Sequence, residues 1–294
     1  MIRRCQSLIF ISFVLCSLGC QPEALAPPPV MELRTEDYAE ARQSFRTQLL
    51  WYGPAAQVTK GVTIPPTVEE IPYTSGEWKL KAYVDRAPAD GGKRPAVLFL
   101  HGGYAFDGSD PIMPQPFRDA GFIVMIPVLR GENGLRGCFS LMYDEVDDVL
   151  SAAQTLAALP YVDSERLFVA GHEAGGTLAL LAAMTSDRFR AAASCSAWCD
   201  QYANHRQYPG LAPLDPANVR EFQMRSPVAY AGSFKCPARL YYGSEEASIA
   251  GTTQETATRA RAAGRDVAAV EVRGGHFTAV PESLRQAIEF FRQQ

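Results

Sequence analysis

Apolar residues follow two spacings along the chain, and each spacing predicts one type of secondary structure. From residue 68 onward, short continuous apolar runs alternate with longer stretches in which apolar residues recur every three or four positions. Continuous runs are typical of strands buried on both faces of a parallel sheet, and the wider spacing is typical of helices that pack on such a sheet. The predicted strands are 68–73, 78–84, 96–100, 122–128, 166–170, 189–194, 238–242 and 267–272, and the predicted helices are 116–120, 143–159, 174–184 and a last helix that starts near Pro281.

Strands that alternate with helices predict an α/β fold with a doubly wound, mostly parallel sheet. The first two strands are separated by a turn at Ser75-Gly76, so we expect them to form an N-terminal antiparallel hairpin. The segment 199–226 breaks the alternation. We interpret it as an excursion at the carboxyl edge of the sheet, where such excursions often cover a site.

Ahead of this core, the spacing of apolar residues predicts one more helix, over 35–52. Tyr38, Ala41, Phe45 and Leu49 recur at helical intervals, and Thr35 is a candidate N-cap. We expect this helix to pack against the main domain. Residues 21–34 include three consecutive prolines and are interpreted as an extended tether.

The first 20 residues have the pattern of an export signal. Two arginines precede an apolar stretch over 8–18, which is too short to span a membrane. The sequence Ser17-Leu18-Gly19-Cys20 resembles the cleavage site of a bacterial lipoprotein, although Ser17 stands where that family has an aliphatic residue. The resemblance implies that residues 1–19 are removed, that Cys20 becomes the first mature residue, and that it is lipidated. An ordinary secretion signal and a retained anchor are the alternatives.

Composition and charge exclude several classes of protein. With 47% hydrophobic and 20% charged residues, the chain is not mostly disordered. Its net charge of −4 comes without a basic cluster, so nucleic-acid binding has no electrostatic support. We expect an exported protein held at the membrane through the lipid on Cys20 only, in the periplasm or cell envelope, or secreted if it is not lipidated.

Export also changes the interpretation of the seven cysteines. Cys138, Cys195, Cys199 and Cys236 would remain in an oxidising compartment, where an even number permits one or two disulfides. Four free buried thiols are the alternative. A metal site is the weakest option, because Cys195 and Cys199 have no paired ligand set nearby.

Four short motifs follow predicted strands, at the edge where a parallel sheet carries its chemistry. The first is His101-Gly102-Gly103-Tyr104, whose glycines allow close approach of backbone N–H groups to a developing oxyanion. The second is Gly171-His172-Glu173-Ala174-Gly175-Gly176, whose small residues suit a sharp strand-turn-helix elbow. The last two are Gly243-Ser244-Glu245-Glu246 and Gly274-Gly275-His276.

The order of elbow, acid and histidine makes residues 66–294 resemble an α/β-hydrolase. Within that fold, the chain is similar to the catalytic domains of the prolyl oligopeptidase and acylaminoacyl-peptidase group. The resemblance covers about three quarters of the chain, and nothing in the sequence corresponds to the propeller of the large peptidases. The supporting stretches are Leu129–Gly134, Tyr143–Asp148, Leu159–Asp163, Ser226-Pro227 and Cys236-Pro237.

The resemblance assigns a role to each motif. His276 matches the general base, and Glu246 matches the acid, with Glu245 as the alternative. Backbone N–H groups near Gly103 or Tyr104, together with that of Ala174, match the oxyanion hole. The resemblance implies no cofactor and no metal, and it implies a small ester, amide or peptide as substrate.

The nucleophile position departs from this pattern, because Glu173 stands where the family has serine. A histidine activates serine by taking its proton, and an ionised glutamate has no proton to give. Glu173 could instead attack as a carboxylate, as aspartate does at the same elbow in haloalkane dehalogenases and epoxide hydrolases, or act as a base on water.

Covalent geometry suggests a further consequence for Glu173. Its side chain spans the same positions as an acylated serine, so we expect its carboxylate to reach its own oxyanion hole at a helix N-terminus. His276 would then lie between Glu173 and Glu246 and hold its proton to higher pH than a free histidine.

Three functions follow from these expectations. The first is an exported hydrolase of ester or amide (peptide) bonds that uses Glu173 or water. The second is a catalytically inactive pseudo-hydrolase that binds a small ligand, a peptide or a protein partner in the cleft. The third is a structural lipoprotein of the cell envelope.

Overall fold

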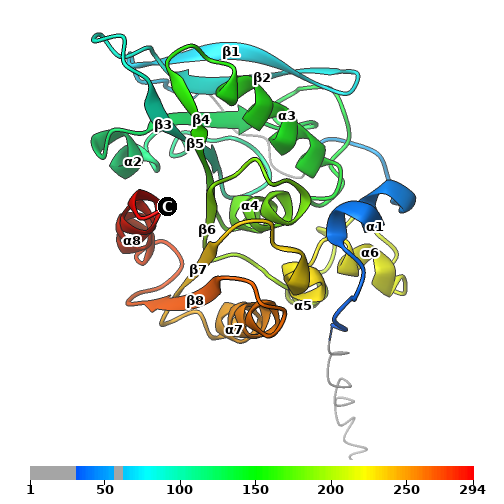
Figure 1. The fold of residues 1–294 in the computed structure, drawn as a ribbon. Coiled ribbons are helices and arrows are strands. Elements are labelled where there is room, and N and C mark those ends of the chain that lie inside the picture. Colours follow the sequence, from blue (N-terminus) through cyan, green and yellow to red (C-terminus); the bar gives the residue numbers. More distant parts are fainter. Residues whose placement is uncertain (1–30, 56–61) are drawn as a thin grey trace, which may run out of the picture. The chain divides into compact units, whose positions relative to one another are not determined.

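The computed structural model describes residues 31–55 and 62–294, so the predicted signal sequence and Cys20 lie outside the described residues. In the described part, eight strands form one sheet in the order β1-β2-β4-β3-β5-β6-β7-β8 (Figure 1). No helix of these residues is long and apolar enough to cross a membrane. The strands are β1 (Val68–Ser75), β2 (Trp78–Asp85), β3 (Arg94–Leu100), β4 (Ile123–Val128), β5 (Val162–His172), β6 (Ala191–Cys195), β7 (Ala238–Gly243) and β8 (Val267–Val272).

The directions of the strands confirm a mostly parallel sheet with an N-terminal antiparallel hairpin. β1 pairs antiparallel with β2, and β2 pairs antiparallel with β4. All pairs from β4 through β8 are parallel. In the hairpin, Ser75 lies opposite Trp78, so Gly76 and Glu77 form the loop at the predicted turn.

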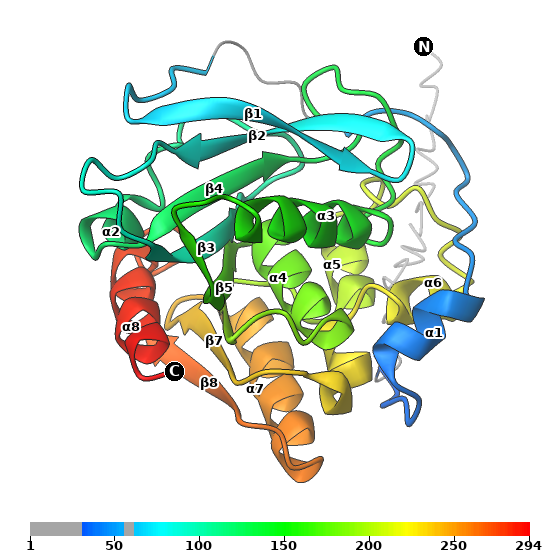
Figure 2. The same cartoon turned by 45° about the horizontal axis from the view of Figure 1, so that its top comes forward.

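Helices cover both faces of the sheet (Figures 1 and 2). Successive residues of the central strand β3 pack on opposite faces of the sheet. Leu98 lies in the apolar cluster that includes α3, α4 and α7, and Phe99 lies in the cluster that includes α2 and α8. This period of two is the property of a strand buried on both faces. The helices are α1 (Tyr38–Ser44), α2 (Gln115–Asp119), α3 (Glu145–Ala157), α4 (Ala174–Thr185), α5 (Gln201–Gln207), α6 (Val219–Gln223), the 3₁₀ segment η1 (Pro227–Ser233), α7 (Ala247–Ala262) and α8 (Val280–Arg292).

The strand order creates a switch point at the centre of the sheet. β3 is flanked by β4 on one side and by β5 on the other, with Leu100 opposite Gly171 at the carboxyl ends. The chain leaves β3 toward one edge of the sheet and later returns to build the other half. A crevice outside the carboxyl ends of the strands at such a point is the usual ligand site of an open α/β sheet.

The predicted helix over 35–52 is wrong in its length, because α1 ends at Ser44. Asp37, rather than Thr35, caps it by accepting a hydrogen bond from the N–H of Ala39 at 2.9 Å. The chain then continues in extended form from Phe45.

The apolar spacing that predicted a longer helix has a different cause. Phe45 and Leu49 do pack against the core, but from a segment without helical structure. Its backbone bonds to distant loops instead, since the N–H of Leu50 donates to the carbonyl of Pro213 at 2.8 Å. Burial of an extended segment can therefore imitate the spacing of one helical face.

The last residues of the predicted tether, 31–34, are part of the folded unit. Met31 is buried, and its carbonyl accepts a hydrogen bond from Arg259 of α7 at 2.7 Å. The N–H of Arg34 donates to the carbonyl of Ala229 at 2.7 Å. The predicted boundary of the tether at residue 34 is therefore wrong for these four residues, and residues 21–30 lie outside the described part of the chain.

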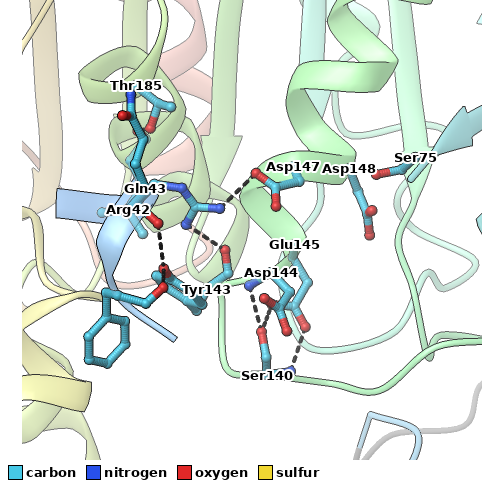
Figure 3. A network of polar contacts seen from close by, with 12 residues as sticks. Arg42, Gln43, Ser75, Ser140, Tyr143, Asp144, Glu145, Asp147, Asp148 and Thr185 are labelled. Carbon is cyan, nitrogen blue, oxygen red and sulfur yellow. Dashed lines mark hydrogen bonds and ion pairs between the residues drawn. The ribbon is translucent and has the colours of Figure 1, made fainter. Parts of the chain in front are cut away.

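The short helix α1 is fastened to the N-terminal end of α3 by one arginine (Figure 3). Arg42 donates to the carbonyl of Tyr143 at 2.8 Å and to Asp147 at 2.7 Å. Its guanidinium also lies 4.5 Å from the centre of the Tyr143 ring. The N-terminal segment is consequently held by charge, hydrogen bonds and aromatic contact together.

Helix α7 was not predicted, because it buries few large apolar side chains. Its buried positions are occupied mainly by threonine and alanine, and Ile249 is its one large buried apolar residue. A helix of this composition packs closely without an apolar stripe that the sequence pattern could reveal.

The four described cysteines are free thiols in the structure, but only Cys195 and Cys199 are buried, whereas Cys138 and Cys236 are half-buried. Cys195 and Cys199 are buried, and burial raises the pKa of Cys195 to about 12 and that of Cys199 to about 11. Both therefore stay protonated and inert at neutral pH.

Between β6 and β7 the chain forms the excursion, which contains α5 and α6. Its anchor is Arg225, whose side chain is fully buried. The guanidinium donates to the carboxylate of Glu221 at 2.7 Å, to the carbonyl of Ser140 at 2.8 Å and to the hydroxyl of Thr47 at 2.7 Å. Arg225 therefore joins the excursion to the loop before α3 and to the N-terminal segment.

We expect Glu221→Gln to lower the free energy of unfolding by about 3–5 kcal/mol, because it leaves the buried Arg225 charge without its counterion. Chemical denaturation monitored by circular dichroism measures this change. The control is Glu255→Gln, which removes the exposed partner of Arg259 and should cost less than about 1 kcal/mol. Equal effects of the two substitutions would contradict the anchoring role of Arg225.

Candidate functional site

Glu173 occupies a sharp turn between β5 and α4. Its backbone has φ 51° and ψ −115°, a conformation that few non-glycine residues adopt. The turn lies so close to β3 that a Cβ on Gly175 would be 2.2 Å from the carbonyl oxygen of Leu100. Glycine is therefore required at this crossing, and the elbow predicted for residues 171–176 is present.

The Glu173 carboxylate accepts a hydrogen bond from the backbone N–H of Gly103. Glu173 also holds the N-cap position of α4, where the helix dipole favours a negative charge. The expected geometry, in which this side chain reaches the donor of its own oxyanion loop, is confirmed for Gly103. Ala174 begins α4 beside Glu173, and Tyr104 lines the adjoining cleft.

In the loop after β3, the position of Gly102 has no room for a side chain. A Cβ on Gly102 would lie 2.8 Å from Nδ1 of His172 and 3.3 Å from Oε2 of Glu173. His172 is buried, its Nε2 lies 3.2 Å from the carbonyl oxygen of His276, and the two rings are 4.7 Å apart. His172 therefore positions the loop that carries His276.

His276 and Glu246 form the acid-base pair that the sequence predicted. Nδ1 of His276 lies 2.8 Å from Oε1 of Glu246. The other carboxylate oxygen accepts hydrogen bonds from the hydroxyl of Ser196 and from the N–H of Gly243, both at 2.7 Å. Glu245, the alternative acid, does not take this position and is exposed beside the pair.

These contacts shift the titration of both partners. The hydrogen bond that His276 donates to Glu246 raises the pKa of His276 against the opposing effect of burial, and the charges of Glu246 and Glu173 add to the rise. Burial opposes ionisation of Glu246, but the hydrogen bonds from His276, Ser196 and Gly243 outweigh it, and the pKa of Glu246 is lowered. An imidazolium between carboxylates is the state that this geometry stabilises.

A second buried histidine, His101, holds the start of the loop that follows β3 and carries Gly103. Nε2 of His101 lies 3.1 Å from Oε2 of Glu132, which also accepts a hydrogen bond from the N–H of Leu129. Burial disfavours the charged ring, yet the Glu132 charge and hydrogen bond prevail and raise the pKa of His101 to about 10. His101 is thus a structural cation that fixes the start of the loop.

Two hollows meet at Glu173 and His276. The main cleft has a volume of about 470 Å³ and continues past these two residues and Tyr104 into a side pocket of about 290 Å³. The main cleft is lined by Tyr104, Glu173, Trp198, Asn204, Tyr208, Leu211, Glu245, Glu246, Ser248, Ile249, Gly275 and His276. An apolar depression on the far side of the side pocket includes the exposed ring of Phe277.

Sequence reasoning missed several residues of this site. Ser196 follows β6 directly and is the second side chain that holds Glu246. Its position directly after a parallel strand could have identified Ser196 as a candidate site residue. Trp198 and Tyr208 form an aromatic wall with their rings 6.3 Å apart, and they come from the excursion region, whose structure no pattern predicted. His205 of the same region packs against Phe222 instead of lining the cleft.

The arrangement brings a histidine, a carboxylate and a backbone N–H together, but the elbow carries no hydroxyl. Ser196 cannot replace it, because its hydroxyl donates to Glu246 and its side chain is buried. Within residues 31–55 and 62–294, no group of three or more His, Cys, Asp or Glu side chains could hold a metal ion.

The pKa of His276 can be measured directly, because the chain contains four histidines. We expect its NMR titration midpoint to lie above the ordinary value of 6.5 and to fall in Glu246→Gln. Because the folded pKa is raised, the stabilisation from the pair is complete below pH 6.5 and is lost as pH rises through the folded midpoint. His276→Ala assigns the signal, and an unchanged midpoint in Glu246→Gln would refute the pairing.

Comparison with known proteins supports a protein of the hydrolase or peptidase type. Residues 109–245, which include the elbow, match the model of the prolyl oligopeptidase family. A protein of Bacillus subtilis (strain 168) named uncharacterized peptidase YtmA is 26% identical over 195 residues, which cover 61% of this chain and 73% of that protein.

Solved structures of peptidases share the fold. The Pyrococcus horikoshii acylaminoacyl peptidase superposes with a TM-score of 0.62 at 20% identity, over 77% of this chain and 40% of that one. The Mycobacterium tuberculosis puromycin-hydrolyzing peptidase superposes with a TM-score of 0.66 at 24% identity, over 78% of this chain and 40% of that one. The chain thus spans about two fifths of the length of these peptidases. It is a protein of α/β-hydrolase fold, similar over residues 109–245 to the prolyl oligopeptidase family.

Proposed function

We propose that the main cleft binds a small ester, amide or peptide ligand and that serine-type acyl transfer does not operate in this chain. The observation that carries the proposal is the hydrogen bond from the Gly103 N–H to the Glu173 carboxylate. The matches to peptidases support the class of ligand, and the contact at the elbow argues against the chemistry of those relatives.

Two independent obstacles oppose acyl transfer. An ionised Glu173 has no proton for His276 to take, so the step that generates a serine nucleophile has no counterpart. In addition, the Gly103 N–H already donates to Glu173 and is not available to a substrate oxyanion. Loss of a single such donor costs about 10²- to 10³-fold in rate.

Two hollows and an apolar depression surround the contact between Glu173 and Gly103. The main cleft and the side pocket meet at Glu173, and the apolar depression beside Phe277 continues from the side pocket through Ser109 and Met113. A ligand with groups on both sides of an ester or amide bond could therefore lie across the site. Concave, partly apolar sites with a few polar groups are typical of small-ligand binding.

A second candidate is hydrolysis by another route, with Glu173 as a carboxylate nucleophile or as a base on water. The intact pair of His276 and Glu246 favours this candidate, because a positioned histidine can activate water. The two candidates differ in the role of Glu173: it blocks the reaction in the first and is needed for it in the second.

We expect the wild-type protein to be inactive on a panel of p-nitrophenyl esters and peptide anilides, and Glu173→Ser to gain hydrolysis and labelling by a fluorophosphonate. A gain of about tenfold or more over background would correspond to about 1.4 kcal/mol or more of transition-state stabilisation. Glu173→Ala is the matched control, since it removes the carboxylate without supplying a hydroxyl. Wild-type turnover that both Glu173→Ala and His276→Ala abolish would establish the second candidate instead.

We further propose that the protein is exported and anchored to the membrane by a lipid on Cys20. The signal-like residues 1–19 and the proline-rich segment that follows them support this location. We expect Cys20→Ala to move the protein from the membrane fraction to the soluble fraction. Incorporation of radiolabelled palmitate into wild type and not into the variant tests the lipid, and membrane retention of Cys20→Ala would contradict the anchor.

A further inference from the structure

The main cleft combines acidic side chains with aromatic walls. Glu173, Glu245 and Glu246 all line it, and none of its lining side chains in the described part of the chain is a lysine or an arginine. Only Glu246 has a histidine partner, namely His276. The walls include Trp198 and Tyr208, whose rings lie 6.3 Å apart at nearly right angles.

The elbow is unfavourable for an anionic ligand group. Its Gly103 N–H already donates to the Glu173 carboxylate, and Glu173 is itself the N-cap residue of α4, so the elbow presents a carboxylate to the cleft. Glu245 adds a second negative charge at the exposed rim, beside Gly275. Among the described residues, no hydrogen bond or ion pair engages its carboxylate, which is therefore available to a ligand in the cleft.

Aromatic rings beside unpaired carboxylates are suited to one class of ligand group. The face of an indole or phenol ring attracts a cation, and this attraction adds to the pull of nearby carboxylates. Trp198 is mostly buried and held in place, whereas Tyr208 is 47% exposed and forms the outer side of the wall. The Tyr208 side of the wall is therefore open to a cation from solvent.

We propose that the ligand of this cleft carries an ammonium group, primary or quaternary, which binds against Glu245 and the wall formed by Trp198 and Tyr208. This inference rests on the proposed ligand-binding function of the cleft and names the chemical class of its ligand. The remainder of the ligand would extend past Glu173 and His276 toward the apolar depression at Phe277.

The test uses three probes of similar size that differ in charge: phenethylamine, N-acetylphenethylamine and 3-phenylpropionate. An alkyl ammonium is fully charged at pH 7. We expect full-length protein in detergent to bind phenethylamine about tenfold more tightly than the acetylated probe, measured by ligand-observed NMR titration. The carboxylate probe should bind more weakly than either.

Two variants test whether the ammonium group binds beside Glu245. Glu245→Gln keeps the size of the side chain and should reduce the preference for phenethylamine about threefold, as expected for one partly exposed charge. Glu77→Gln removes an exposed carboxylate in the hairpin loop between β1 and β2 and should leave the preference unchanged.

The possible results separate this inference from the proposed function. If the acetylated probe binds as tightly as phenethylamine, the cleft binds ligands and the inference about charge is wrong. An unchanged preference in Glu245→Gln would also overturn it, because the cation would then bind elsewhere. If none of the three probes binds, both the inference and the proposed binding function fail.

Discussion

Between β5 and α4 the backbone passes so close to the end of β3 that a Cβ at Gly175 would lie 2.2 Å from the carbonyl oxygen of Leu100. This contact brings the loop that follows β3 against the elbow, and it fixes the side chain of residue 173 beside the Gly103 N–H. The position of the residue is set by the packing of the sheet and does not depend on which side chain stands there. A fold built to present a nucleophile therefore presents a carboxylate with the same geometry.

The electrostatics of the site follow from this placement. The Glu173 carboxylate accepts from the Gly103 N–H beside the N-terminus of α4, so it stands where an acyl-transfer enzyme develops a transient negative charge. His276 experiences the charge of Glu173 in addition to the charge of Glu246, and its raised pKa favours the protonated ring. A protonated histidine cannot act as a general base until the pH exceeds its pKa, so the charge of Glu173 lowers the fraction of His276 that is free to accept a proton at a given pH.

The core of the fold could be predicted from the sequence because its strands are continuous apolar runs and its motifs follow them. The pairing of Glu246 with His276 was also accessible, since both follow parallel strands at one edge of the sheet. Other parts of the fold and of the site could not be predicted from the sequence, and each has a physical reason. Helix α7 packs through threonine and alanine, so it has no apolar stripe, and the segment after Ser44 buries Phe45 and Leu49 without being helical. Trp198 and Tyr208 reach the cleft through a fold of the excursion region that depends on distant contacts, such as those of Arg225.

The residues at the strand ends and the residues of the excursion are held in place by different parts of the fold. The groups that could act on a bond stand at strand ends and are fixed by the sheet, whereas much of the main cleft's wall comes from the excursion region anchored by Arg225. Among the described residues, Arg225 bonds to Ser140, Thr47 and Glu221 and to no group of the elbow, so the excursion is held from a side other than the elbow. The identity of residue 173 can therefore differ without disturbing the part of the cleft wall that the excursion supplies. Different contacts maintain the elbow and this part of the wall.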